Sequence, residues 1–195
     1  MRQSKKHKQI TETAHDLFMR HGIKRVTIEE ICRTAGVSKM TFYKYFENKN
    51  DLAVFVLDSI FKKAEKRYHD IMSQDVPYSE KVKDIIKMKL EASKDISQEM
   101  LKDLWHNPIP EVADYMKKRT QLSLKQFLDD MIAAQNKGEI RQNINPHFIL
   151  YFLGQMQEMA GDEKVLNMYE TTQDLTSEMI NFFFYGILSR EKKSA

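Results

Sequence analysis

The stretch from residue 27 to residue 49, TIEEICRTAGVSKMTFYKYFENK, constrains the fold more than any other part of the chain. Thr27, followed three residues later by Glu30, has the spacing of a capping box, which starts a helix. Gly36 comes just after the apolar positions of that helix, where a left-handed residue commonly ends one. The first third of this stretch therefore predicts a short helix that stops at a tight turn.

A second short helix is predicted directly after that turn. Ser38 is a suitable N-cap, and Val37 and Phe42 have the spacing of a hydrophobic staple, which fixes the angle at which the chain enters a helix. Two short helices joined by a tight glycine turn form a helix-turn-helix motif. In such a motif the second helix lies in the major groove of DNA.

The predicted second helix has two chemically different faces. Phe42, Tyr45 and Phe46 fall together at helical spacing, so we expect them to pack inward against Ile31, Val37 and the first helix. The opposite face carries groups suited to phosphate oxygens, base edges or a thymine methyl, from Lys39, Met40, Tyr43 and Lys44. The alternative is the solvated face of an ordinary helical hairpin. The glycine turn and the separation of aromatic from basic side chains favour the DNA-binding interpretation.

These residues carry a family resemblance. The run GVSKMTFYKYFENK resembles the DNA-binding region of the TetR family of bacterial transcription regulators, and the resemblance extends over about residues 5–60. It implies a three-helix DNA-binding domain followed by a helical domain that binds a small molecule and forms the dimer. It also implies repression that the small molecule relieves.

The resemblance assigns DNA contacts to particular positions of this chain. Lys39, Thr41 and Lys44 fall where base or phosphate contacts are made, and Thr27, Tyr43 and Lys49 match phosphate-binding positions. Met40 stands where many relatives have Gly, Ala or Pro, so the resemblance implies no base preference for this residue. The expected DNA-binding residues are Thr27, Ser38, Lys39, Met40, Thr41, Tyr43, Lys44 and Lys49.

The charge distribution supports a polyanion partner independently of the motif. Residues 1–50 contain eleven Lys or Arg against five Asp or Glu, whereas the remainder contains twenty against twenty-three. A basic N-terminal part on a mildly acidic body is the electrostatic pattern of a nucleic-acid-binding domain.

Length and composition describe ordinary helical material. The 195 residues are 42% hydrophobic and 30% charged, with only six Gly and four Pro, and no apolar run approaches the roughly 20 residues of a membrane span. We therefore expect no membrane partner. The single cysteine, Cys32, is expected to be a packing residue in a reducing cytoplasm.

The rest of the chain is predicted to be helical, which makes the fold all-α with about nine helices. The expected domains are a helix-turn-helix domain over 1–48, a linking helix over about 49–73, and an effector-binding and dimerisation domain over 74–195. Asn48 is expected to cap the linking helix. Later helices are expected to begin at Pro110 and Pro146, and the last to run from about 172 to 188.

The last two predicted helices are apolar on nearly all sides, with FILYFL at 148–153 and INFFFYGIL at 180–188. A helix on a small domain needs only one apolar face for its own core, so a second face needs another cover. We expect a homodimer, and the alternative is a monomer whose core uses both faces. The expected dimer contacts are Phe148, Phe152, Met156, Ile180, Phe183, Phe184 and Ile187.

An effector site is predicted mainly from the family resemblance. Methionine and aromatic side chains on the middle helices would suit an apolar or aromatic small molecule, although the same spacing is also typical of plain core. The expected ligand-binding residues are Met88, Met100, Trp105, Tyr115, Met116, Phe127, Met131, Tyr151 and Gln155.

The sequence offers no constellation typical of an enzyme. The six histidines are scattered without metal-ligand spacing, and neither a Gly-rich phosphate loop nor a GxSxG motif occurs. We therefore expect no catalytic residues, no metal and no cofactor. The alternative to a DNA-binding regulator is a helical adaptor that uses the hairpin to bind protein. A salt-dependent affinity for duplex DNA separates the two.

Overall fold

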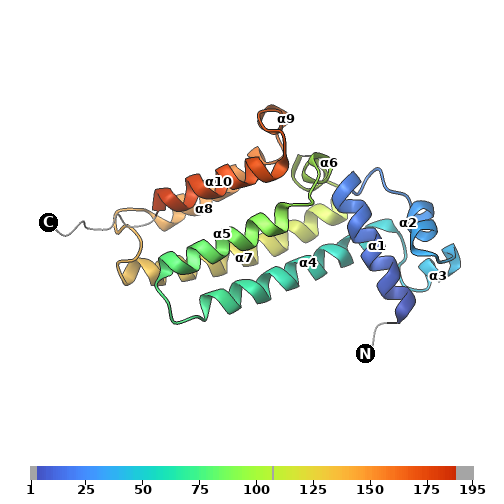
Figure 1. Ribbon diagram of the computed structural model, residues 1–195, viewed down its shortest axis with the longest axis horizontal. Coiled ribbons are helices and arrows are strands. Elements are labelled where there is room, and N and C mark those ends of the chain that lie inside the picture. Colours follow the sequence, from blue (N-terminus) through green and yellow to red (C-terminus); the bar gives the residue numbers. More distant parts are fainter. Residues whose placement is uncertain (1–3, 107, 188–195) are drawn as a thin grey trace. The chain divides into compact units, whose positions relative to one another are not determined.

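The computed structural model describes residues 4–106 and 108–187, with side chains as far as residue 185. The described residues form ten α-helices and one π-helical turn, which confirms the all-α prediction (Figure 1). In chain order they are α1 (Lys5–His21), α2 (Ile28–Ala35), α3 (Lys39–Tyr43), α4 (Lys49–Met72), α5 (Tyr78–Ser93), α6 (Gln98–Leu101), the π turn η1 (Lys102–His106), α7 (Pro110–Asn136), α8 (Pro146–Met159), α9 (Glu163–Leu166) and α10 (Thr172–Ile187).

The chain divides into two compact units. The first comprises residues 1–64 together with residues 95–117, and the second comprises residues 65–94 together with residues 118–195. The long helices α4 and α7 each contribute to both units. The domains predicted from sequence, 1–48 and 74–195, divide the chain differently because residues 95–117 return to the N-terminal helices.

The core of the first unit is built on the helical periodicity of α1. Ile10, Ala14 and Phe18 recur every four residues and are almost completely buried, together with Phe42 and Leu52. Later residues join the same core, namely Met100, Leu104, Val112 and Met116. The helix-turn-helix is therefore packed as part of a larger core than three helices supply.

Local capping fixes where the helices of the first unit begin and end. The backbone N–H of Glu30 donates to Thr27 Oγ1 at 3.2 Å, and Gly36 adopts the left-handed conformation with φ 65°. The backbone N–H of Asp51 donates to Asn48 Oδ1 at 2.9 Å, which confirms the predicted cap of α4. These contacts explain why two helices as short as α2 and α3 form at these positions.

In the second unit, α5, α7, α8 and α10 run with their axes nearly aligned (Figure 1). Their inward side chains form one core that contains Ile85, Met131 and Phe184, and α5 packs closely against α10. The predicted starts at Pro110 and Pro146 are confirmed, and Asn145 Oδ1 accepts the backbone N–H of His147 at 2.9 Å. None of the helices described is long and apolar enough to cross a lipid bilayer.

Candidate nucleic-acid interface

Helix α3 presents its outward face because its inward face is anchored by one aromatic residue. Phe42 is fully buried in the first unit and contacts the ring of Phe46, with the two ring centroids 5.8 Å apart. On the other side, Met40 is 78% exposed and Tyr43 is 55% exposed, and Lys44 is also exposed. The thioether of Met40 and the phenol of Tyr43 thus project from α3, and the ammonium group of Lys44 projects from the residue that follows it, while Phe42 anchors the helix in the core.

Lys39 lies on the same face but is already paired. Its Nζ donates to Glu29 Oε1, which comes from α2 across the turn. The hydrogen bond to Lys39 lowers the pKa of Glu29, and the same hydrogen bond raises the pKa of Lys39. The pair keeps both groups charged and joins the two helices of the motif on their exposed side.

Two of the predicted DNA-binding hydroxyls cap helices, and a third is hydrogen-bonded to one of them. Thr27 Oγ1 caps α2, and Ser38 Oγ accepts the backbone N–H of Thr41 at 3.1 Å to cap α3. The hydroxyls of Ser38 and Thr41 also share a hydrogen bond of 3.0 Å. Thr27 and Ser38 are exposed, so each can offer its hydroxyl to a phosphate without giving up the cap.

Lys49 was expected to bind phosphate, but its ammonium group is already hydrogen-bonded within the protein. Its Nζ donates to the backbone carbonyls of Lys24 at 2.9 Å and Val26 at 2.7 Å. Burial lowers the pKa of the Lys49 ammonium, and the nearby carboxylate of Asp103 opposes that effect. Two of its three N–H groups therefore stabilise the loop between α1 and α2, because the neighbouring carbonyls would otherwise lack donors.

Tyr45 was expected to pack on Ile31, Val37 and the first helix, and its ring and hydroxyl contacts are made at α1. Its ring meets that of His7 edge-on at 5.3 Å, and its hydroxyl lies 2.5 Å from Ser4 Oγ. His7 also contacts the rings of Phe46 and Phe55. Helix α3 ends at Tyr43, so the chain turns there and directs Tyr45 away from α2. His7 carried no sequence signal, because an isolated histidine on a basic helix is usually solvated.

Comparison with known proteins agrees with this geometry. Residues 10–54 match the model for bacterial regulatory proteins of the tetR family. The uncharacterized HTH-type transcriptional regulator YdeS of Bacillus subtilis is 39% identical over 61 residues, which are 31% of this chain and 29% of YdeS. The solved structure of regulatory protein TetR from Rhodobacter sphaeroides superposes with a TM-score of 0.76 at 15% identity, covering 95% of this chain and 100% of that one. Residues 10–54 therefore form a DNA-binding region of the tetR type.

A second solved structure has the same fold over most of its length. The transcriptional regulator FadR from Bacillus subtilis, in complex with stearoyl-CoA, matches with a TM-score of 0.72 at 16% identity, covering 93% of this chain and 99% of that chain. At these identities the likeness establishes the fold alone. The chain spans less than half the length of the curated HTH-type regulators that it matches in sequence.

The residues expected to bind an effector are divided between the two units. Four belong to the first unit, where Met100 and Met116 are buried in its core and Trp105 and Tyr115 pack against it. The others belong to the second unit: Met88, Phe127 and Met131 lie in its core, whereas Tyr151 and Gln155 are exposed on α8. The helical spacing that suggested a pocket lining is used here largely for core packing.

The predicted dimer contacts also divide into two groups. Ile180, Phe183 and Phe184 are buried within the second unit of the single chain, where Phe127 contacts both phenylalanines. They therefore belong to the core of the chain itself, which corrects the prediction. Phe148 is 58% exposed, Phe152 and Met156 are partly buried, and Ile187 is the last residue of α10, with its side chain outside the described part.

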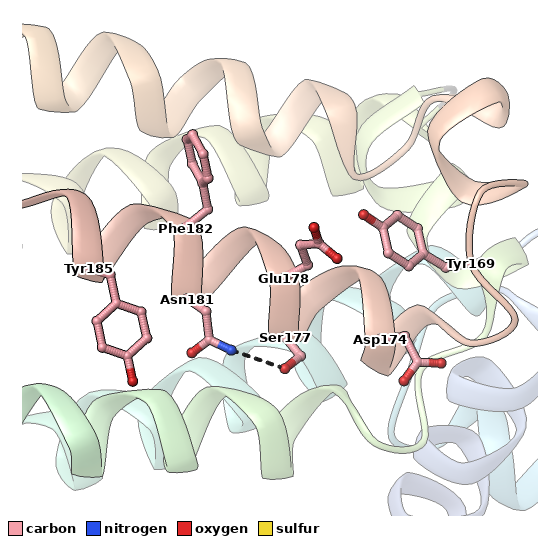
Figure 2. A pocket seen from close by; sticks show the side chains of 7 residues that line it. All are labelled: Tyr169, Asp174, Ser177, Glu178, Asn181, Phe182 and Tyr185. Atoms are coloured by element: carbon pink, nitrogen blue, oxygen red, sulfur yellow. Dashed lines mark hydrogen bonds between the residues drawn. The ribbon is translucent and has the colours of Figure 1, made fainter.

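The exposed apolar surface of α10 is carried by side chains that are not among the predicted dimer contacts. Phe182 and Tyr185 are 72% and 76% exposed, and they line an open hollow of about 820 Å³ on α10 together with Tyr169 (Figure 2). A smaller hollow of about 160 Å³ lies between Phe148, Phe152 and Phe182. Because α10 turns about 100° per residue, Phe182 and Tyr185 share a face while Phe183 and Phe184 point inward.

Proposed function

We propose that this chain is a sequence-specific DNA-binding transcription regulator that acts as a repressor on a near-palindromic operator. The observation that carries the proposal is the face of α3, where Met40, Tyr43 and Lys44 project outward opposite the fully buried Phe42. The inner face of a recognition helix must be fixed by packing, and its outer face must carry varied polar and apolar groups, because base edges are read by side chains held in register.

The regulator is proposed to bind as a homodimer. Exposed aromatic side chains lie on α8 and α10, namely Phe148, Tyr151, Phe182 and Tyr185. Exposed apolar patches of this kind mark interaction surfaces. A twofold pair places two copies of α3 in successive major grooves, about 34–36 Å apart, and so requires inverted half-sites in the DNA.

Release by an apolar or aromatic small molecule is the regulatory part of the proposal. The second unit supplies a deformable core in which Met88 and Met131 pack near Phe127. Methionine side chains adapt to a guest more readily than branched ones. The FadR neighbour, whose structure contains stearoyl-CoA, has the same fold, which makes long acyl compounds the first group to screen.

The test of DNA binding is the salt dependence of affinity. Fluorescence anisotropy with a labelled duplex should show log Kd changing linearly with log salt, because bound Lys and Arg release counterions from the phosphates. Analytical ultracentrifugation of the same sample should show a dimer, whose affinity for a two-half-site duplex exceeds that for one half-site.

The double variant Phe182→Ser, Tyr185→Ser removes two exposed aromatic side chains. Its sedimentation coefficient should shift toward that of the monomer, and its affinity for the two-half-site duplex should fall. Leu122→Ser is the matched control, because Leu122 is also 60% exposed but lies on α7. A salt-independent affinity would instead indicate the protein-binding adaptor. A wild-type monomer would remove the dimer from the proposal.

A further inference from the structure

The turn between α1 and α2 is held through both backbone polar groups of a single residue, Lys24. The backbone N–H of Lys24 donates to Asp103 Oδ2 at 2.9 Å, and the backbone carbonyl of Lys24 accepts from Lys49 Nζ at 2.9 Å. Asp103 is 79 residues away in sequence, yet both partners belong to the same compact unit as the turn. A loop residue with an exposed side chain is thus fixed by two charged groups.

Gly22 makes the approach of Asp103 possible. It has φ 77°, a conformation that other residues rarely adopt, and its N–H donates to the carbonyl of Phe18 at 2.9 Å. A Cβ atom at this position would lie 2.6 Å from Asp103 Oδ2, well inside van der Waals contact. The glycine therefore serves the turn twice, through its backbone conformation and through the space that it leaves for the carboxylate.

Asp103 is itself carried by an unusual segment. It lies in the π-helical turn η1, and the next residue, Leu104, is buried in the core that contains Phe18 and Phe42. Helix α6, which directly precedes η1, is attached to α1 at its first turn: the backbone N–H of its N-cap, Ser97, donates to the carbonyl of Met19 at 2.9 Å. π-helical turns are rare and occur often at functional sites, because they redirect side chains that a regular helix would point elsewhere.

We propose that Asp103 is a positioning residue for the DNA-binding face. By fixing the Lys24 peptide, it sets the turn from which α2 begins, and α2 carries α3. The DNA-binding module of this chain then includes residues 95–106 in addition to the N-terminal helices. This inference rests on the proposed DNA-binding function, but its structural part can be tested without any DNA.

The structural arm measures hydrogen exchange at the Lys24 amide by NMR in the full chain. In Asp103→Ala the amide loses its acceptor, so its exchange should accelerate by about tenfold or more. Asp114→Ala is the matched control, because it removes one carboxylate from an exposed position in the same unit. Unchanged exchange in Asp103→Ala would overturn the proposal.

The functional arm compares affinity for a duplex selected by the wild-type protein with affinity for random duplex DNA. Removing an acidic group raises the attraction to phosphates, so Asp114→Ala should bind both duplexes slightly more tightly. Asp103→Ala should instead bind the selected duplex about tenfold more weakly, with little change on random DNA. Parallel behaviour of the two variants would show that Asp103 does not position the face.

Asp103→Asn covers the case in which the alanine variant does not fold. The asparagine oxygen can still accept the Lys24 N–H, but a neutral acceptor forms a weaker hydrogen bond than a carboxylate. The Lys24 amide should therefore exchange faster, and the selected duplex should bind more weakly, than in the wild-type protein; equality with wild type in both would contradict the proposal. If the wild-type protein selects no sequence, the proposed function fails, while the Lys24 amide still reports whether Asp103 holds the turn.

Discussion

The ammonium group of Lys39, at the start of α3, is paired with the carboxylate of Glu29 in α2. The two side chains are 54% and 62% exposed, so the pair lies on the surface that is proposed to meet DNA. A phosphate that approaches Lys39 must compete with Glu29 for the same N–H groups. The free protein therefore holds one of its DNA-facing charges partly neutralised.

Replacing Glu29 by Gln should strengthen binding to any duplex. The change frees Lys39 for a phosphate, so the slope of log affinity against log salt should become steeper by about 0.9, the contribution of one further contact. Anisotropy titrations at several salt concentrations measure this slope. Glu30→Gln removes the same charge one residue away and is expected to keep the wild-type slope; identical slopes in both variants would contradict the role of the pair.

Lys49 should matter for stability as well as for DNA affinity. Lys49→Met removes the donor from the carbonyls of Lys24 and Val26, so the free energy of unfolding should fall by about 1–3 kcal/mol. Urea unfolding followed by circular dichroism measures the change. Lys44→Met, at an exposed position, should leave the unfolding midpoint within error, and an equally small effect at Lys49 would show that its two hydrogen bonds are dispensable.

His7 should make stability depend on pH. Its Nδ1 is buried without a hydrogen-bond partner among the described residues, and burial lowers the pKa of the ring below 6.5. The unfolded chain then binds a proton more readily than the folded chain. The contribution of His7 to the free energy of unfolding is therefore complete above pH 6.5, the pKa of the unfolded chain. It is lost progressively as the pH falls from 6.5 toward the lower pKa of the folded chain.

Thermal unfolding between pH 5 and pH 8 tests this dependence. His7→Phe keeps an aromatic ring between Tyr45 and Phe55 and should flatten the profile in that range. His15→Gln changes another histidine of the same helix and should leave the wild-type profile in place. A profile that His7→Phe does not alter would assign the pH dependence to other groups.

Two tyrosines of the second unit should respond oppositely to loss of the hydroxyl. The Tyr78 hydroxyl is buried without a hydrogen-bond partner among the described residues, whereas the Tyr68 hydroxyl donates to Asp130 Oδ2 at 2.8 Å. Tyr78→Phe should raise the free energy of unfolding by about 1 kcal/mol, and Tyr68→Phe should lower it by a similar amount. Urea unfolding of the pair measures both; destabilisation by Tyr78→Phe would reveal a hidden partner for its hydroxyl.

The helix-turn-helix could be predicted from sequence because its signals are local. Thr27, Gly36, Ser38 and Asn48 act within three or four residues of themselves, and each is found in the expected cap or turn. The burial of Phe42 follows from the same short-range pattern. The all-α fold was predictable for the same reason, since Ser, Thr, Asn or Pro signals mark most of the helix starts in the described residues.

The contacts that complete the site could not be predicted because they join distant parts of the chain. Nothing near Asp103 indicates that it reaches the Lys24 peptide, and nothing near His7 indicates that it meets Tyr45. A lysine that binds carbonyls and one that binds phosphate look alike in sequence, which explains the placement of Lys49. On α10, the four consecutive aromatic residues at 182–185 do not reveal from sequence alone which of them face inward.

The most direct test of the account is a selection of duplexes from a random library by the wild-type protein and by Lys39→Ala, Met40→Ala and Lys44→Ala combined. The wild-type protein should enrich two inverted half-sites whose centres lie about one helical turn apart. The three changes are at exposed positions, so the triple variant should have the circular dichroism spectrum of the folded wild-type protein. It should lose the enrichment of the inverted half-sites while retaining weak, salt-dependent binding to DNA. Enrichment of the same sequence by both proteins would show that α3 does not read the DNA.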